Sequence, residues 1–274
     1  MISGTTLTNP FDSPAALAHS NACVFDGKRL TRDGGDGAPS ARTAFVHDGF
    51  RALILNEHFS CVAAKAAVRH GNYRFGLYKE LASAPSCAGL ARDLFAFVQA
   101  EAAGAPEFRT FVASFDGPLP PDEATFERLL WSTLQQLHDL DVVHHEWDRR
   151  SSPDPAQPDF SFSFAGTSFF VVGLHAASSR TTRRFAWPTL VFNPHQQFEH
   201  LRETGRYRRF QQVIRGAERT LQGDINPMLA DFGSVSEASQ YSGRQVDSDW
   251  QCPFHARTAR DVHGVDRDGR SVDR

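Results

Sequence analysis

The sequence predicts an α+β fold, with a single domain in which a mixed or antiparallel sheet is flanked by helices. Helix-like and strand-like segments are interspersed along the chain without the regular alternation that produces a parallel βαβ sheet. Residues 160–175 have the pattern of a hairpin, because FSFSF alternates, Gly166 provides a turn and SFFVVGLH is apolar. A chain of 274 residues that is 41% hydrophobic and 22% charged can bury a substantial core.

The most strongly patterned helix is predicted from Asp122 to Leu140, where apolar residues recur at helical spacing. A second helix is expected over residues 60–70, with Ser60 as a suitable N-cap and Gly71 as a suitable C-cap. Apolar spacing further predicts a helix over 88–103 and strands over 108–115 and 189–193.

A long helix is expected to follow the last of these strands, from Pro194 toward Gln222. Asn193 can cap this helix, Pro194 suits its first position, and Gln196 completes a capping-box pattern. The predicted start places His195 at the N-terminus of the helix.

Two terminal segments differ in composition from the rest of the chain. Residues 1–45 are rich in Gly, Ser, Asp and Arg and are expected to form a flexible N-terminal arm. Residues 255–274 are polar and are expected to form a disordered tail. The predicted catalytic domain therefore spans residues 46–254.

Composition argues against several classes of protein. The net charge of −3 does not favour nucleic acid or a membrane surface as a partner. No apolar run approaches a membrane span, and the first twenty residues lack a secretory leader pattern, so a cytoplasmic location is expected. The four cysteines form no C-x-x-C pair and are expected to be reduced thiols. The chain also lacks G-x-G-x-x-G, Walker A, H-E-x-x-H and G-x-S-x-G motifs.

Arginines are concentrated in residues 175–222, which suggests that this part of an acidic protein binds an anion. Arg180, Arg183 and Arg184 lie between two predicted strands, where guanidinium groups can hold carboxylates through paired hydrogen bonds. The arginines between 202 and 219 are explained as readily by a solvated helix face.

Two histidines in the same region are candidates for a metal site. A helix N-terminus disfavours a positive imidazolium, so His195 is expected to remain neutral, and the neutral ring is the form that binds metals. His175 closes a strand that is predicted to be buried. A structural role is the alternative for both residues.

Two further motifs suggest other iron chemistry. His144 and Glu146 match half of a site with two histidines and one carboxylate, although H-x-E is a short and common pattern and a polar helix terminus is the better explanation. Cys252, followed by Pro253, can supply a thiolate to haem iron. The neighbouring aromatic residues, Trp250 and Phe254, instead suggest a packed C-terminal anchor.

Six segments together resemble the YqcI/YcgG family, over roughly residues 45 to 254. The segments are residues 59–78, 131–141, 170–202, 221–233, 236–244 and 250–254. The chain departs from the family pattern at Ala176, where relatives often have proline after the GLH sequence.

This resemblance implies a haem b cofactor and a monooxygenase that hydroxylates a terminal guanidine nitrogen of L-arginine, giving Nω-hydroxy-L-arginine. It places that reaction in antibiotic biosynthesis of the D-cycloserine type, with an arginase-like hydrolase acting on the product. The oxidant is O₂ or peroxide, and the electron donor stays open. The resemblance favours a histidine as the iron ligand, which implies His195 as the metal ligand and His175 as a catalytic residue.

The resemblance and the residues together suggest a role for each candidate. The arginine trio is expected to pair with the haem propionates, and Phe192 to contribute to the apolar surface of the cofactor site. Glu237 and Asp231 are expected to hold the cationic groups of the substrate. The alternatives are a haem sensor or carrier without turnover, and a non-haem iron oxygenase that uses His144 and Glu146.

Overall fold

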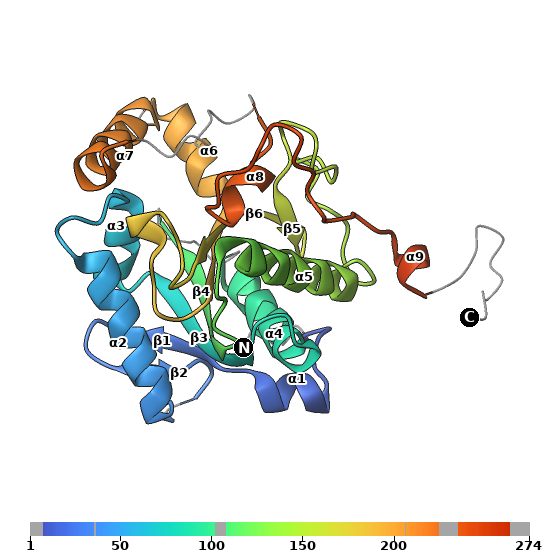
Figure 1. Cartoon of the computed structure of the whole chain (residues 1–274). Helices are drawn as coiled ribbons and strands as arrows, with labels where there is room; N and C mark the ends of the chain where they lie inside the picture. The colour runs from blue at the N-terminus through green and yellow to red at the C-terminus, as the bar shows by residue number, and fades with distance from the viewer. Residues whose placement is uncertain (1–7, 36, 102–107, 206, 225–234, 264–274) are drawn as a thin grey trace.

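The computed structural model describes residues 8–35, 37–101, 108–205, 207–224 and 235–263. These residues form one open, seven-stranded mixed sheet with helices on both faces (Figure 1), which confirms the predicted α+β class. The strand order is β2-β1-β3-β4-β7-β6-β5. The strands are β1 (Ala22–Phe25), β2 (Leu30–Arg32), β3 (Tyr73–Glu80), β4 (Thr110–Gly117), β5 (Phe162–Phe164), β6 (Thr167–Leu174) and β7 (Thr189–Pro194).

The strands β3 and β4 pair in parallel, and every other neighbouring pair in the sheet is antiparallel. A parallel pair needs a crossover, and the helix between β3 and β4 provides it. The helices are α1 (Pro14–His19), α2 (Ala41–Leu55), α3 (Val62–His70), α4 (Ala84–Glu101), α5 (Glu123–Asp141), α6 (Gln196–Glu203), α7 (Tyr207–Gln222), α8 (Ala238–Tyr241) and α9 (Ala259–His263). Among the described residues, no helix is long and apolar enough to cross a membrane.

The two faces of the sheet bury different sets of side chains. On one face, α4 and α5 cover a Phe-rich core that includes Phe126, Phe169 and Phe192. On the other face, α2 and α3 cover a smaller core around Phe50 and Phe75. Since successive residues of a strand point to opposite faces, the central strands contribute side chains to both cores.

The predicted hairpin and the predicted helix over residues 122–140 are both confirmed. β5 and β6 pair in antiparallel fashion through a turn at Ala165 and Gly166, whose φ angles are 50° and 69°. Positive φ at both central residues is typical of the hairpin turn that matches strand twist. At α5, the Asp122 side chain accepts a hydrogen bond from the Thr125 backbone N–H, at 2.7 Å. α3 also ends as predicted, with Gly71 in the left-handed conformation, but Cys61 rather than Ser60 holds the N-cap position.

The single long helix predicted from Pro194 is wrong in two respects. Pro194 is the last residue of β7 and pairs with Phe169, while the His195 N–H continues the ladder by donating to the Ser168 carbonyl at 2.8 Å. Strand pairing therefore displaces the helix start to Gln196. Gly205, with φ of 70°, then separates α6 from α7.

Part of the segment expected to be a flexible arm belongs to the sheet. Residues 22–25 pair with β3, and residues 30–32 extend the sheet by one more strand. The buried carboxylate of Asp93 fixes the entry to β1, because it accepts hydrogen bonds from the backbone N–H groups of Asn21 and Ala22 and from the Tyr78 hydroxyl. Residues 1–7 and 36 of the expected arm lie outside the described residues.

The expected C-terminal tail also begins with placed residues. The Arg257 N–H donates to His138 Nε2 at 2.8 Å, which attaches this segment to α5, and α9 follows. Residues 264–274 of the predicted tail lie outside the described residues.

The close approach of β6 to α5 depends on Gly173. A Cβ atom at this position would lie 2.5 Å from Cε1 of Phe126 and 3.0 Å from Cδ1 of Leu130. We expect Gly173→Ala to lower the free energy of unfolding by about 1–3 kcal/mol in urea titrations, because the Phe126 ring is buried and must shift. Gly216→Ala in α7 is the control, since its Cβ would meet no atom within 4 Å, and it should stabilise the protein by up to about 1 kcal/mol. Equal stability of the two variants would contradict this packing.

Candidate functional site

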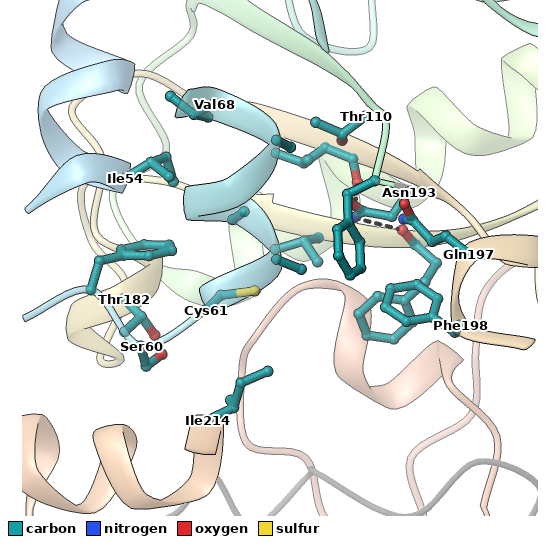
Figure 2. A pocket seen from close by; sticks show the side chains of 18 of the residues that line it. Ile54, Ser60, Cys61, Val68, Thr110, Thr182, Asn193, Gln197, Phe198 and Ile214 are labelled. Carbon is teal, nitrogen blue, oxygen red and sulfur yellow. Dashed lines mark hydrogen bonds between the residues drawn. The ribbon is translucent and has the colours of Figure 1, made fainter. Parts of the chain in front are cut away.

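A cavity of about 270 Å³ lies between the sheet and the helices α2, α3, α6 and α7 (Figure 2). Its floor is formed by residues of β6 and β7 that face away from α5, and Glu237 and Gln240 close one side. The volume is near the lower end of the range for small-molecule sites, which are concave and mostly apolar. The cavity is therefore the leading candidate for a ligand site among the described residues.

The walls of the cavity are largely apolar. Phe170, Val172 and Leu174 of β6 form the floor, and the helices contribute further apolar side chains. Among these, Phe198 and Ile214 are visible on the α6 and α7 side of Figure 2. Such a lining favours a ligand with a large apolar surface, because burial of each Å² of apolar area contributes roughly 25 cal/mol.

Charged groups interrupt this apolar lining at a few positions. Four arginines and one carboxylate line the cavity, namely Arg109, Arg183, Arg202, Arg215 and Glu237. The excess of arginines over carboxylates in the lining suits a ligand that carries more carboxylates than cationic groups. Opposite charges at fixed positions also orient a ligand that has both signs.

The predicted arginine trio is divided by the structure. Only Arg183 lines the cavity, and its guanidinium donates to the backbone carbonyls of Gly173, Gln240 and Tyr241. Arg180 donates to Asp224 at 2.7 Å. Arg184 donates through Nε to the Ser178 carbonyl at 3.1 Å.

These contacts give the trio a structural role in the chain as described. Arg183 ties β6 to α8, whereas Arg180 ties the loop after β6 to the end of α7. All three arginines are predicted to bind carboxylates. Only Arg183 is placed where its side chain can contact a ligand in the cavity.

Glu237 and His195, which the sequence predicts as site residues, lie together beside the cavity. His195 Nε2 is 3.2 Å from Glu237 Oε1, and both side chains are buried. The second oxygen of Glu237 accepts a hydrogen bond from the Ser161 hydroxyl at 2.9 Å. Glu237 lines the cavity, while the His195 ring lies behind it.

The other ring nitrogen of His195 also faces a carboxylate. His195 Nδ1 is 3.8 Å from Oε1 of Glu199, which lies one helical turn further along α6. Both nitrogens thus face acidic side chains rather than the cavity. This arrangement favours a role for His195 in proton transfer or in holding Glu237 over the role of iron ligand that the sequence predicts.

His175 and Phe192 lie on the opposite face of the sheet from the cavity. The His175 ring stacks on Phe126 of α5 with a centroid distance of 4.2 Å. Phe192 packs in the same core, at 5.9 Å from Phe169. The sequence pattern does not show which face of a strand borders the cavity. On β7 the cavity is lined by Val191 and Asn193, which are the neighbours of Phe192 and point to the other face of the sheet.

Burial lowers the pKa of His175 to about 4, and neither of its ring nitrogens has a hydrogen-bond partner among the described residues. Burial disfavours the charged ring, so this histidine is neutral at physiological pH.

Cys61 is a cavity residue that the sequence pattern does not single out. Its side chain enters the cavity from the N-cap position of α3 (Figure 2). A cysteine sulfur at this position is a potential ligand for a transition metal. The signal that could have identified it is its place directly before a predicted helix, two residues after Phe59.

The other sequence candidates lie away from the cavity. Burial raises the pKa of Cys252 to about 12, so its thiol is protonated, and it packs beside the core as the anchor interpretation predicts. Glu146 is exposed and pairs with Arg149, whereas the His144 ring packs against Phe11. Asp231 lies outside the described residues.

The described residues fit a haem in some respects. The cavity offers apolar walls, arginines for carboxylates, and the Cys61 thiol as an iron ligand. No three side chains of His, Cys, Asp or Glu converge on one point in the described ranges. A haem needs no such cluster, because the macrocycle supplies four ligands and the protein supplies one or two.

The fold and the cavity define an α+β protein with a largely apolar cavity on one face of its sheet, which is the candidate ligand site. The sequence profile of the YqcI/YcgG family matches residues 50–255, and the chain belongs to that family. The matched range includes nearly all of the cavity and the Glu237–His195 pair. No curated protein and no solved structure matches the chain.

The lowered pKa of His175 predicts a pH dependence of stability. Below the unfolded pKa of about 6.5, the unfolded chain binds a proton that the folded ring rejects, so stability falls as the pH decreases from 6.5 toward 4. This single group accounts for a loss of about 3 kcal/mol at the lower end. In His175→Phe, which keeps the stack on Phe126, urea titrations should show a shallower dependence on pH.

The matched control is His58→Phe, which replaces an exposed histidine outside both cores, and the change in pH dependence should be larger in His175→Phe than in this control. A wild-type pH dependence in His175→Phe would show that the folded ring is not protected from protonation.

Proposed function

We propose that this protein is a haem-dependent monooxygenase that hydroxylates a terminal guanidine nitrogen of L-arginine to give Nω-hydroxy-L-arginine. The observation that carries the proposal is the composition of the cavity. It combines apolar walls, a thiol at a helix N-terminus, four arginines and one buried carboxylate. Membership of the YqcI/YcgG family supports a haem cofactor through the resemblance already described.

In this proposal Cys61 is the iron ligand, in place of His195. When bound, haem supplies the activation of O₂ or peroxide that a guanidine N-hydroxylation requires. Cys61 occupies the N-cap position of α3, and a thiolate ligand to haem iron favours cleavage of the O–O bond. The arginines that line the cavity are the candidates for the propionates and for the carboxylate of the substrate.

Glu237 is the group proposed to bind the guanidinium. Its carboxylate lines the cavity, one of its oxygens accepts a hydrogen bond from the Ser161 hydroxyl, and the other lies 3.2 Å from His195 Nε2. A planar guanidinium pairs with a carboxylate through two parallel hydrogen bonds, which fixes its orientation. The apolar walls exclude water and strengthen this pairing.

The family resemblance implies a setting in antibiotic biosynthesis of the D-cycloserine type, with an arginase-like hydrolase that consumes the hydroxylated product. A cytoplasmic location is proposed from the composition of the chain. The electron donor stays open in the proposal.

The substrate is tested by mass spectrometry of reactions that contain haem-loaded protein, a reductant or peroxide, and one amino compound. L-arginine should gain one oxygen atom. Agmatine should react more weakly because it lacks the carboxylate, and lysine should react poorly because it lacks the planar guanidinium. An enzyme can reject a substrate analogue that leaves buried polar groups of its site unpaired by roughly four orders of magnitude in kcat/KM.

Oxygenation of lysine without oxygenation of arginine would refute the guanidine assignment. Haem binding without any product would favour a sensor or carrier.

The iron ligand is tested by absorption spectroscopy of cysteine variants. The wild-type protein should show a Soret band, with a thiolate-type shift in its reduced CO complex. Cys61→Ser should lose the shift or the haem, because a hydroxyl is a poor substitute for a thiolate. Cys252→Ser is the matched control and should keep the wild-type spectrum, since Cys252 lies outside the cavity. A wild-type spectrum in Cys61→Ser would reject Cys61 and return a histidine to consideration.

A further inference from the structure

Two carboxylates and one imidazole form a row from the protein surface to the cavity. Glu199 is on α6, and its side chain is 36% exposed, so it exchanges protons with solvent. His195 lies next in the row and is buried, and Glu237 is buried and lines the cavity. The separations are 3.8 Å from Glu199 Oε1 to His195 Nδ1 and 3.2 Å from His195 Nε2 to Glu237 Oε1.

We propose that Glu199, His195 and Glu237 form a proton path between the solvent and the cavity. This inference rests on the proposed function, since it assigns the path to a guanidinium bound at Glu237. In that role Glu237 is a catalytic residue that contacts the substrate, whereas Glu199 and His195 act through it.

The geometry suits an imidazole that passes protons between two carboxylates. A neutral histidine ring has one nitrogen that donates and one that accepts, so it can take a proton at one side and release another at the opposite side. In this chain each ring nitrogen faces one carboxylate, and a positive charge on the ring during transfer lies between two negative groups. The 3.8 Å separation is longer than a hydrogen bond, and a small rotation of the partly exposed Glu199 side chain would close it.

The chemical need for such a path comes from the substrate. A guanidinium nitrogen has no available lone pair, and it becomes a nucleophile only after losing a proton. Glu237 accepts this proton from the guanidinium and passes it to His195 Nε2. The ring releases its Nδ1 proton to Glu199, which transfers it to water. Each transfer moves one proton and changes no oxidation state, so the step needs no redox partner.

The charged groups around the path are consistent with its direction. The carboxylates of Glu199 and Glu237 lie on the two sides of the His195 ring. Arg150, which pairs with Asp148 at 2.7 Å, also lies 3.9 Å from Glu199 Oε2. The Ser161 hydroxyl occupies the Glu237 oxygen that does not face the ring, which leaves Oε1 for the transfer.

The first test compares Glu199→Gln with Glu203→Gln, a matched control on the exposed side of the same helix. Glu199→Gln should lower kcat for arginine hydroxylation by roughly 10- to 100-fold, at the lower end of what a positioned proton-transfer group contributes. The KM for arginine should stay unchanged, because Glu199 does not line the cavity. The solvent deuterium isotope effect on kcat should increase. Equal kcat in Glu199→Gln and the control would overturn the proposal.

The second test uses chemical rescue of His195→Ala. Added imidazole should restore a substantial part of kcat, and 1-methylimidazole, which cannot both donate and accept a proton, should restore much less. A purely structural role predicts equal rescue by both compounds or rescue by neither, and either result would contradict the path.

A third measurement separates this proposal from the proposed function. In cofactor-free protein, the ring ¹⁵N resonances of His195 should respond to Glu199→Gln and to Glu237→Gln, but not to Glu203→Gln. If the ring responds in this way and arginine is not hydroxylated, the path exists and the substrate assignment fails. If the ring ignores both substitutions, the path is rejected whatever the reaction of the enzyme is.

Discussion

The alternation of residues along the β6–β7 pair is the constraint on which the rest of the structure depends. The two strands pair over six positions, between β4 and the edge strand β5. Phe169 and Val171 point toward α5 and complete the main core, whereas Phe170 and Val172 point to the other face and form the cavity floor. A shift of one residue in this pairing would exchange the two sets, placing the cavity residues in the core.

This alternation explains which predicted site residues approach the ligand cavity. His175 continues the set that faces α5, and Phe192 belongs to the same face on β7. Both are therefore buried in the packing of the core. His195 follows the end of β7, where the ladder gives way to α6, and this change of direction brings it next to Glu237.

Much of the fold is predictable from local patterns, and the missing parts depend on long-range pairing. Helix α5 and the β5–β6 hairpin have strong periodicity and turn signals, which a single sequence displays. The strands β1 and β2 are short and lie in a Gly-rich segment, so their pairing with β3 is not visible in local composition. The break between α6 and α7 is likewise hidden, because the apolar spacing continues across Gly205.

The candidate site is predictable in part for a similar reason. Glu237, His195 and Arg183 belong to segments with unusual charge or family resemblance, and each lies in or beside the cavity. Cys61 and Phe198 become cavity residues only when α3 and α6 are placed against the sheet. Because no sequence rule identifies which face of a strand is covered by which helix, the division of the arginine trio could not be predicted.

The central proposal is that haem binds in the cavity with Cys61 as its iron ligand. Its most direct test is a crystal structure of the protein after reconstitution with haem. We expect density for one haem in the cavity, with Cys61 Sγ bonded to the iron. Haem bound elsewhere, or iron bonded to another side chain while Cys61 lies apart from it, would contradict this proposal.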